Sequence, residues 1–345
     1  MRGAGNGRRV PCDLFRGGAV LSGSMRWMDM TKPTILMIPR LADDAIASLK
    51  QSYTVIGPVD GGDAASIPAE AREARALVTY GGLRTDAELM AALPKLELVA
   101  CYGTGIEGVD AAAAKARGIK LCNAADANAR SVAEFAVGLM LCAMRGIGRG
   151  DRFVREGLWN RRGIEPVANT PDLAGRKIGI YGLGAIGSRI ASRAAAFEME
   201  VGYHSRTPKP ELDYRFHDSL LGLAEWADVL MVAVRASAET RNAVDDAVLN
   251  ALGPEGYVVN ISRGLVIDED ALCDALEQKH IAGAALDVFA AEPHVPERLR
   301  QLDNVVLTPH IAASSQDAKK AQLRTLLGNL EAFFAGRSMP SAVPL

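Results

Sequence analysis

The sequence predicts an α/β fold with two doubly wound parallel sheets. Short apolar runs that are typical of buried strands alternate with helix patterns in two series, over 34–122 and 177–307. Such alternation indicates parallel strands covered by helices. An apolar helix pattern over 131–144 separates the two series, and a chain of 345 residues is long enough for two domains.

The first series contains five strand patterns with helices between them. The helix expected at 85–93 has Thr85 as its N-cap and Glu88 three residues later, which is the spacing of a capping box, and Pro94 follows it. The strands are expected at 34–38, 53–56, 76–80, 96–101 and 119–122, and the other helices at 43–49 and 110–117.

The second series contains six strand patterns, which is the number expected of a Rossmann dinucleotide-binding domain. They lie at 177–181, 200–203, 229–234, 257–261, 283–288 and 305–307. A last helix over 316–335 carries one apolar stripe, formed by Leu323, Leu326, Leu327, Leu330 and Phe334. We expect hinges between the two halves near 124–130 and 310–315.

A glycine loop joins the first strand of the second series to a helix. The pattern G-x-G-x-x-G in this setting predicts a dinucleotide site, with the pyrophosphate at the helix N-terminus. The first glycine permits the turn, the second lets the phosphate approach, and the third lets helix and strand pack. The expected cofactor-binding residues of this loop are Gly182, Gly184, Ala185, Ile186 and Gly187.

The next strand indicates which dinucleotide is bound. NAD sites usually carry an acidic residue about 20 positions past the glycines, and no carboxylate occurs between Val201 and Lys209. Arg206 can instead bind a 2′-phosphate, with Ser205 and Thr207 as hydrogen-bond donors. NADPH is the expected cofactor, and NADH is expected to bind more weakly.

Three residues suited to carbonyl reduction follow three strands of the second series. They are Arg263, Glu292 and His310. Ligands of open α/β sheets bind outside the carboxyl ends of the strands. A histidine can donate the proton, an arginine can polarise a carbonyl or hold a carboxylate, and a glutamate can orient the histidine.

These motifs together resemble the D-2-hydroxyacid dehydrogenase family over about residues 34–340. The resemblance rests on the glycine loop, on Asn260-Ile-Ser-Arg263-Gly, on Gly283-Ala-Ala-Leu-Asp287-Val-Phe-Ala-Ala-Glu292-Pro and on Thr308-Pro-His310. Within the family, Ser205-Arg206-Thr207 resembles the cofactor loop of the NADPH-dependent glyoxylate/hydroxypyruvate reductases. The implied reaction is reduction of a small 2-oxo acid, glyoxylate or hydroxypyruvate, to the D-2-hydroxy acid.

The resemblance implies that a Rossmann domain at 127–312 is inserted into a smaller flavodoxin-like substrate domain, formed by 31–126 and 313–345. Residues 1–30 lack any strand or helix pattern and are expected to be a disordered leader, with Met25, Met28 or Met30 as the true start. A homodimer through the helix at 131–144 is also implied. That helix is apolar nearly all round, so it fits either a core helix or an interface.

The resemblance also assigns roles to single residues. His310 is the acid/base, Glu292 orients it, and Arg263 binds the substrate carboxylate and carbonyl. The backbone of Tyr80-Gly81-Gly82 is expected to hold the carboxylate, with Gly103 nearby. The remaining cofactor-binding residues are expected to be Val234, Arg235 and Asp287.

Some positions depart from the family pattern. Arg235 stands where an uncharged residue is usual, and it can reach the adenosine phosphate, the mouth of the substrate site or solvent.

Trp159 is interpreted as an ordinary packing anchor, with insertion into a partner's cleft as the alternative. His204 and His217 are interpreted as surface residues.

Composition limits the other partners. The formal charge of −2 gives no sign of nucleic acid or an anionic membrane as partner, and no apolar run is long enough to span a membrane. Five widely spaced cysteines without a Cys-x-x-Cys motif indicate neither disulfides nor a metal site, and fit the reducing cytoplasm.

Four rival functions stay open. A 3-phosphoglycerate or aryl-pyruvate dehydrogenase would share the three catalytic residues, although the former commonly has an acidic NAD residue and a further domain. A formate dehydrogenase would have glutamine at the position of Glu292. A dinucleotide-sensing corepressor would be a binding protein, and a turnover assay separates it from an enzyme.

Overall fold

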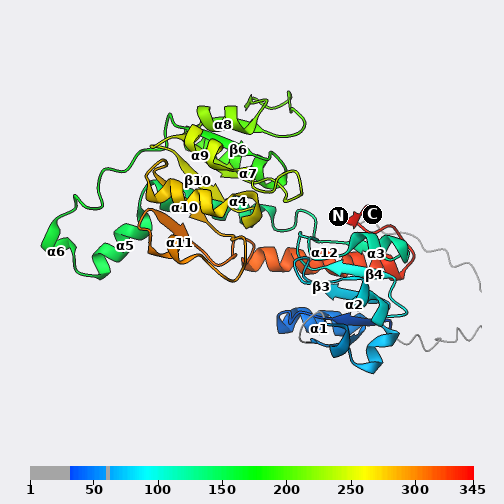
Figure 1. The fold of residues 1–345 in the computed structure, drawn as a ribbon. Coiled ribbons are helices and arrows are strands. Elements are labelled where there is room, and N and C mark those ends of the chain that lie inside the picture. Colours follow the sequence, from blue (N-terminus) through cyan, green and yellow to red (C-terminus); the bar gives the residue numbers. More distant parts are fainter. Residues whose placement is uncertain (1–31, 60–62) are drawn as a thin grey trace, which may run out of the picture. The chain divides into compact units, whose positions relative to one another are not determined.

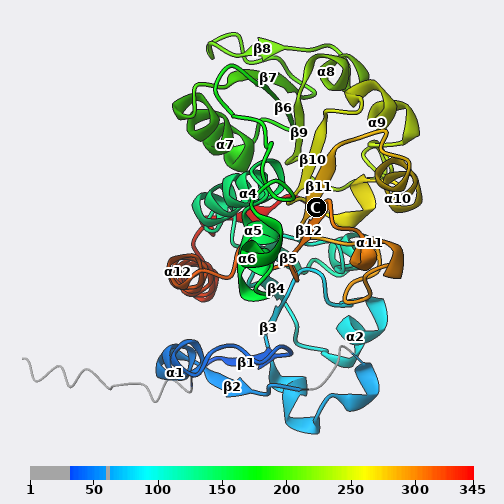
Figure 2. The ribbon, with the colours of Figure 1, turned by 90° about the vertical axis from the view of Figure 1, so that its left-hand side faces the viewer.

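The computed structural model describes residues 32–59 and 63–345. The expected leader at 1–30, with its three possible start codons, lies outside the described residues. Two sheets are formed, each covered by helices on both faces, which confirms the predicted fold class (Figures 1 and 2).

The first sheet has the strand order β13-β5-β4-β3-β1-β2, and β1 to β5 are parallel. The order of β1 to β5 is that of flavodoxin-like doubly wound sheets. Its strands are β1 (Thr34–Met37), β2 (Thr54–Ile56), β3 (Ala76–Thr79), β4 (Leu98–Cys101), β5 (Lys120–Cys122) and β13 (Ala342–Val343). Its helices are α1 (Asp43–Ser52), α2 (Ala87–Ala92), α3 (Ala111–Ala116) and α12 (Gln316–Phe334), with 3-10 turns at Ala64–Ser66 and Ala69–Glu73.

The end of the chain returns to this sheet. Leu326, Leu330 and Phe333 of α12 are buried in the same core cluster as α1, while Leu323, Leu327 and Phe334 pack at its margin. The predicted stripe is therefore confirmed, with Phe333 as an additional member. β13 then pairs antiparallel with β5, a contact that no sequence pattern indicated.

The second sheet has the order β12-β11-β10-β9-β6-β7-β8 and is parallel throughout. Its strands are β6 (Lys177–Tyr181), β7 (Glu200–His204), β8 (Arg215–Phe216), β9 (Val229–Val232), β10 (Tyr257–Asn260), β11 (Gly283–Leu286) and β12 (Val305–Leu307). The six predicted strands are present. The unpredicted β8 completes the Rossmann order 3-2-1-4-5-6, to which β12 adds a seventh strand.

Helices cover both faces of the second sheet. Figure 2 shows α4 and α7 on one side of its strands and α8, α9 and α10 on the other. The helices are α4 (Ala129–Met144), α5 (Ile147–Arg155), α6 (Trp159–Arg162), α7 (Ala185–Ala196), α8 (Leu220–Trp226), α9 (Asp246–Leu252), α10 (Glu269–Glu277) and α11 (Glu297–Gln301), with a 3-10 turn at Gly264–Val266.

The apolar helix α4 is a core helix. Val132, Ala136 and Met140 are buried in the cluster that it shares with α7 and the sheet. Among the described residues no single helix has the length and apolar composition to cross a membrane. The pair α4 and α5, bent by 62°, meets that test by length and composition alone.

The N-cap predicted for α2 is wrong. The helix begins at Ala87 and its N-cap is Asp86, whose carboxylate accepts a hydrogen bond from Leu89 N at 2.9 Å. Thr85 is fully buried, and its backbone N–H donates to Gly108 O at 2.8 Å. Thr85 is therefore a buried residue of the loop that precedes α2, and the expected capping box of Thr85 and Glu88 does not form at the start of this helix.

The surface position predicted for His217 is also wrong. Its side chain is buried and its ring lies 5.1 Å from the Trp226 ring. His204, at the end of β7, is half-buried, and its Nδ1 lies 2.9 Å from His217 O. Two-residue β8 ends just before His217 and carries it onto the sheet, which explains why the sequence did not indicate its burial.

Burial of His217 predicts an acid-sensitive contribution to stability. Its Nε2 has no hydrogen-bond partner among the described residues, and burial lowers its pKa. The unfolded chain therefore takes up the proton first, so stability is lost as pH falls below about 6.5, the pKa of a free histidine. We expect His217→Leu to show a smaller loss of Tm than wild type between about pH 7.5 and 5. His280→Leu, at an exposed position, is the control, and an equal loss in all three proteins would refute the effect.

Candidate active site

The glycine loop runs from β6 into α7 and is shaped to receive phosphate. Gly182 has a φ of 98°, and a Cβ there would lie 2.7 Å from Val234 N. Gly187 packs against the carbonyl of Gly182 with no room for a side chain. Gly184 is the N-cap of α7, no side chain caps the helix, and the space at its Cβ position is open. The residues present therefore fit a dinucleotide whose pyrophosphate binds the free N–H groups of α7.

The loop after β7 carries the predicted phosphate-binding residues. Arg206 is exposed, and Ser205 Oγ donates to Thr207 O at 2.8 Å, which shapes the loop. Lys209 Nζ donates to Leu183 O at 2.6 Å, so its ammonium lies against the glycine loop. Lys209 is a second cation in the stretch from Val201 to Lys209, which has no carboxylate, and this was a usable signal in the sequence that the prediction did not include.

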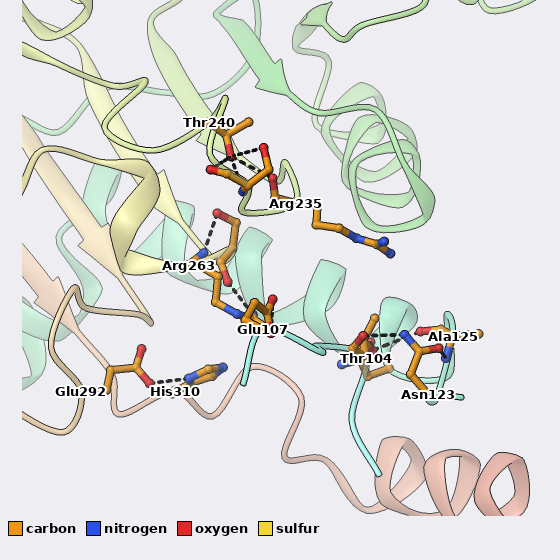
Figure 3. A network of polar contacts seen from close by, with 12 residues as sticks. Thr104, Glu107, Asn123, Ala125, Arg235, Thr240, Arg263, Glu292 and His310 are labelled. Carbon is orange, nitrogen blue, oxygen red and sulfur yellow. Dashed lines mark hydrogen bonds and ion pairs between the residues drawn. The ribbon is translucent and has the colours of Figure 1, made fainter. Parts of the chain in front are cut away.

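His310 and Glu292 form a direct pair. His310 Nδ1 lies 2.7 Å from Glu292 Oε2, and both side chains keep access to solvent (Figure 3). The other carboxylate oxygen, Oε1, accepts a hydrogen bond from Phe289 N at 3.0 Å. This second bond fixes the carboxylate, and the carboxylate in turn fixes the imidazole. The Nε2 edge of His310 is left to face a reactant.

The backbone of His310 is held in an uncommon conformation. Its φ of 53° lies in the left-handed region that few residues other than glycine adopt. His310 N donates to Asp287 O at 2.8 Å. The buried Asp287 carboxylate accepts from Thr308 Oγ1, Ile311 N and Ala312 N at 2.6–2.9 Å. Asp287 therefore anchors the loop that presents His310.

A tight turn after β10 presents Arg263. Asn260 folds this turn, since its Oδ1 accepts from Ser262 N at 3.0 Å and its Nδ2 donates to Arg263 O at 3.1 Å. Arg263 Nη1 donates to Ser262 O at 2.7 Å. Its Nη2 lies 3.2 Å from Glu107 Oε1, an ion pair that sequence analysis missed (Figure 3). No motif or periodicity marks Glu107, because the contact joins segments more than 150 residues apart.

The predicted substrate loop follows β3. Gly81 O accepts a hydrogen bond from Gly108 N at 2.7 Å, which ties this loop to the segment that carries Glu107. The exposed Tyr80 packs edge-on against Tyr102, with ring centroids 5.8 Å apart. Gly82 is exposed, and Gly103 follows the neighbouring strand β4. The carboxylate contact of this loop remains a prediction.

The other predicted positions have mixed surroundings. Val234 lies against the glycine loop, whereas Figure 3 shows the exposed Arg235 side chain directed away from Arg263 and His310. Asp287 uses its carboxylate within the protein, and its contact with the cofactor remains a prediction. Trp159 is 56% exposed, so the interpretation as an ordinary packing anchor is wrong. Trp159 lies at the start of α6, which Figure 1 shows extending with α5 away from the second sheet.

The described residues hold no group of three or more His, Cys, Asp or Glu side chains that could bind a metal ion. Four cysteines in this part of the chain are free, and burial raises the pKa of Cys101 and of Cys122 to about 12. The oriented imidazole of His310, the guanidinium of Arg263 and the dinucleotide-shaped loop together suit transfer of a hydride and a proton to a carbonyl.

Comparison with known proteins agrees with this chemistry. Residues 137–312 match the family described as D-isomer specific 2-hydroxyacid dehydrogenase, NAD binding domain. The chain is 40% identical over 269 residues to a glyoxylate/hydroxypyruvate reductase of Arabidopsis thaliana, which covers 78% of this chain and 85% of that protein. It is 39% identical over 274 residues to the hydroxyphenylpyruvate reductase of Plectranthus scutellarioides, covering 79% and 87%.

Solved structures agree as well. The NADPH-dependent glyoxylate/hydroxypyruvate reductase of Sinorhizobium meliloti, in complex with NADP and malonate, superposes with a TM-score of 0.86 and 38% identity. The match covers 90% of this chain and 97% of that chain. The resemblance found in the sequence is confirmed, and the chain belongs to the D-isomer specific 2-hydroxyacid dehydrogenase family.

Proposed function

We propose that this protein is an NADPH-dependent reductase of a small 2-oxo acid, glyoxylate or hydroxypyruvate, and that it forms the D-2-hydroxy acid. The observation that carries the proposal is the His310–Glu292 pair at 2.7 Å, held on a loop anchored by Asp287. NADPH, when bound at the glycine loop, supplies the hydride. The chain's own residues supply the anchor, the orientation and the proton.

His310 is the proton donor in this proposal. In the protonated imidazolium, Nδ1–H donates to the Glu292 carboxylate, and Nε2 carries the second proton, which moves to the carbonyl oxygen of the substrate. Arg263 holds the substrate carboxylate and stabilises the negative charge that develops on the carbonyl oxygen. The backbone N–H groups of Tyr80, Gly81 and Gly82 complete the carboxylate site. In the reverse direction, His310 accepts the hydroxyl proton.

The choice of substrate is drawn from the relatives. Two of the relatives described above are named as glyoxylate/hydroxypyruvate reductases, and the third is named as a hydroxyphenylpyruvate reductase. A panel of glyoxylate, hydroxypyruvate, pyruvate, hydroxyphenylpyruvate and phosphohydroxypyruvate, assayed with NADPH and with NADH, tests the choice. Glyoxylate or hydroxypyruvate should give the highest kcat/KM. A higher kcat/KM for hydroxyphenylpyruvate or phosphohydroxypyruvate would mean that this compound, and not glyoxylate or hydroxypyruvate, is the substrate. No turnover with any of the five compounds would favour a dinucleotide sensor.

The preference for NADPH rests on Arg206 and on the absence of an acidic residue between Val201 and Lys209. We expect Arg206→Ala to raise the Kd for NADPH by about 10- to 100-fold. This is the change that results from losing a charge-assisted hydrogen bond, which contributes about 1.5–3 kcal/mol to binding. The Kd for NADH should change little, because NADH has no 2′-phosphate. Fluorescence titration of the bound nicotinamide measures both constants.

Arg300→Ala is the matched control for this experiment, since Arg300 is an exposed arginine on α11. It should leave both constants unchanged. Equal weakening of NADPH and NADH by Arg206→Ala would mean that Arg206 does not read the 2′-phosphate, and Lys209 would then be the next residue to replace.

We also propose that the protein is a cytoplasmic homodimer. The support is a group of large apolar side chains, each more than half exposed, on the segment that contains α5 and α6: Ile147, Val154, Trp159 and Ile164. Such a group favours burial against a second copy. The core position of α4 makes this segment, rather than α4 alone, the proposed interface. Light scattering at micromolar concentration measures the mass, and a monomer would refute the proposal.

A further inference from the structure

Arg263, the proposed anchor of the substrate carboxylate, already has a carboxylate neighbour from this chain. Its Nη2 lies 3.2 Å from Glu107 Oε1, while its Nη1 donates to Ser262 O. A Cβ at Gly105 would lie 2.5 Å from Nη2, so the guanidinium reaches directly over the backbone beside Glu107. The positive charge that Arg263 offers to an incoming anion is therefore reduced by a fixed negative charge.

The segment that carries Glu107 is held at both ends. On one side Asn123 Nδ2 donates to Thr104 O at 2.6 Å, and Thr104 Oγ1 donates to Ala125 O at 3.0 Å (Figure 3). On the other side Gly108 N donates to Gly81 O at 2.7 Å. Glu107 thus stands between the proposed substrate loop and Arg263, and its backbone cannot move away without breaking these bonds.

The pair is weak enough to be replaced by a substrate. The side chains of Arg263 and Glu107 are 34% and 37% exposed, and one contact at 3.2 Å joins them. Ion pairs with this much solvent contribute little to stability. A carboxylate that binds the guanidinium through two oxygens forms a stronger contact than this single one. An incoming substrate can therefore take the place of the Glu107 carboxylate, which stays tethered nearby.

We propose that Glu107 is a specificity-determining residue that restricts the site to 2-oxo acids with a single negative charge. The inference rests on the proposed function, because it takes Arg263 as the carboxylate anchor. A monoanion satisfies Arg263 and leaves the tethered Glu107 carboxylate facing the rest of the substrate. A second carboxylate on the substrate meets that negative charge and is repelled. A hydroxyl group at the same place can donate a hydrogen bond to it.

Oxamate and oxalate test the proposal, because they are nearly equal in size and carry one and two negative charges. Their Kd values are measured by calorimetry on the full chain saturated with NADP⁺. Wild type should bind oxamate more tightly than oxalate. In Glu107→Gln, which removes the charge and keeps the shape, the ratio of the oxalate Kd to the oxamate Kd should fall about tenfold, or 1.4 kcal/mol.

Glu88→Gln is the matched control, since Glu88 lies exposed on α2 and its carboxylate is 3.7 Å from Arg84. It removes the same charge and should leave the ratio unchanged. A ratio that falls less than about threefold in Glu107→Gln, or an oxamate Kd that rises because Arg263 has lost a support, would overturn the role of Glu107. If the substrate panel still shows turnover while the ratio is unchanged, the proposed function stands and only this inference fails.

Discussion

Replacing His310 by alanine is expected to lower kcat/KM for 2-oxo acid reduction by about 10²–10⁴-fold, which is the usual contribution of a positioned acid/base. The physical reason is that the carbonyl oxygen must gain a proton as the hydride arrives, and the imidazole paired with Glu292 is the group placed to give it. The Kd for NADPH should stay within about twofold, because the variant leaves the glycine loop intact. Steady-state kinetics and cofactor titration measure the two effects.

The control for this prediction is His280→Ala. His280 is exposed near the end of α10 and makes no contact with Glu292 or Arg263 in the described structure. Its activity should equal that of wild type. If His310→Ala retains nearly full activity, the proton comes from another group and the assignment of His310 is wrong.

Replacing Asp287 by alanine is expected to lower both stability and activity. The variant removes three hydrogen bonds that a buried carboxylate accepts and leaves Ile311 N and Ala312 N without that partner. The free energy of unfolding should fall by about 3–5 kcal/mol, since unsatisfied buried groups are costly. kcat/KM should fall as well, because the loop that presents His310 loses the carboxylate bonds that hold Thr308, Ile311 and Ala312 on either side of it. Denaturant unfolding and kinetics measure the two losses.

Two companion variants sharpen this test. Asp287→Asn keeps one acceptor oxygen and should lose less stability than the alanine variant, while Asp270→Ala, at an exposed site on α10, should lose almost none. A loss below about 1 kcal/mol in Asp287→Ala would contradict the anchoring role. The Kd for NADPH of the same variants tests the predicted contact between Asp287 and the cofactor.

The parts of the fold that follow local rules were predictable from sequence. β6 is five residues long and runs directly into a glycine loop, so strand, turn and helix reinforce one another, and the bounds of β6 agree with the structure. The two-residue strands β8 and β13 are too short to leave a pattern. They form because a neighbouring strand already provides the partner groups.

In the active site, too, the residues that follow local sequence rules were predictable, and those that depend on contacts between distant segments were not. His310, Glu292 and Arg263 were found because each follows a strand, and the carboxyl ends of parallel strands meet at one edge of a sheet. Glu107 and the anchoring role of Asp287 depend on how loops fold back on each other, and no spacing encodes that. His217 was misjudged for a related reason, since its burial depends on Trp226, which reaches it from α8.

The short outer strands have a consequence for how other molecules can bind. In the described part of the chain, the first sheet ends in strands of two and three residues, β13 and β2, and the second sheet ends likewise in β8 and β12. Long, flat edge strands expose unpaired N–H and C=O groups that template strand addition and aggregation. Neither sheet offers such an edge, so an extended peptide has little backbone to pair with. Association must instead use side chains, and the exposed apolar group between Ile147 and Ile164 is where they are gathered.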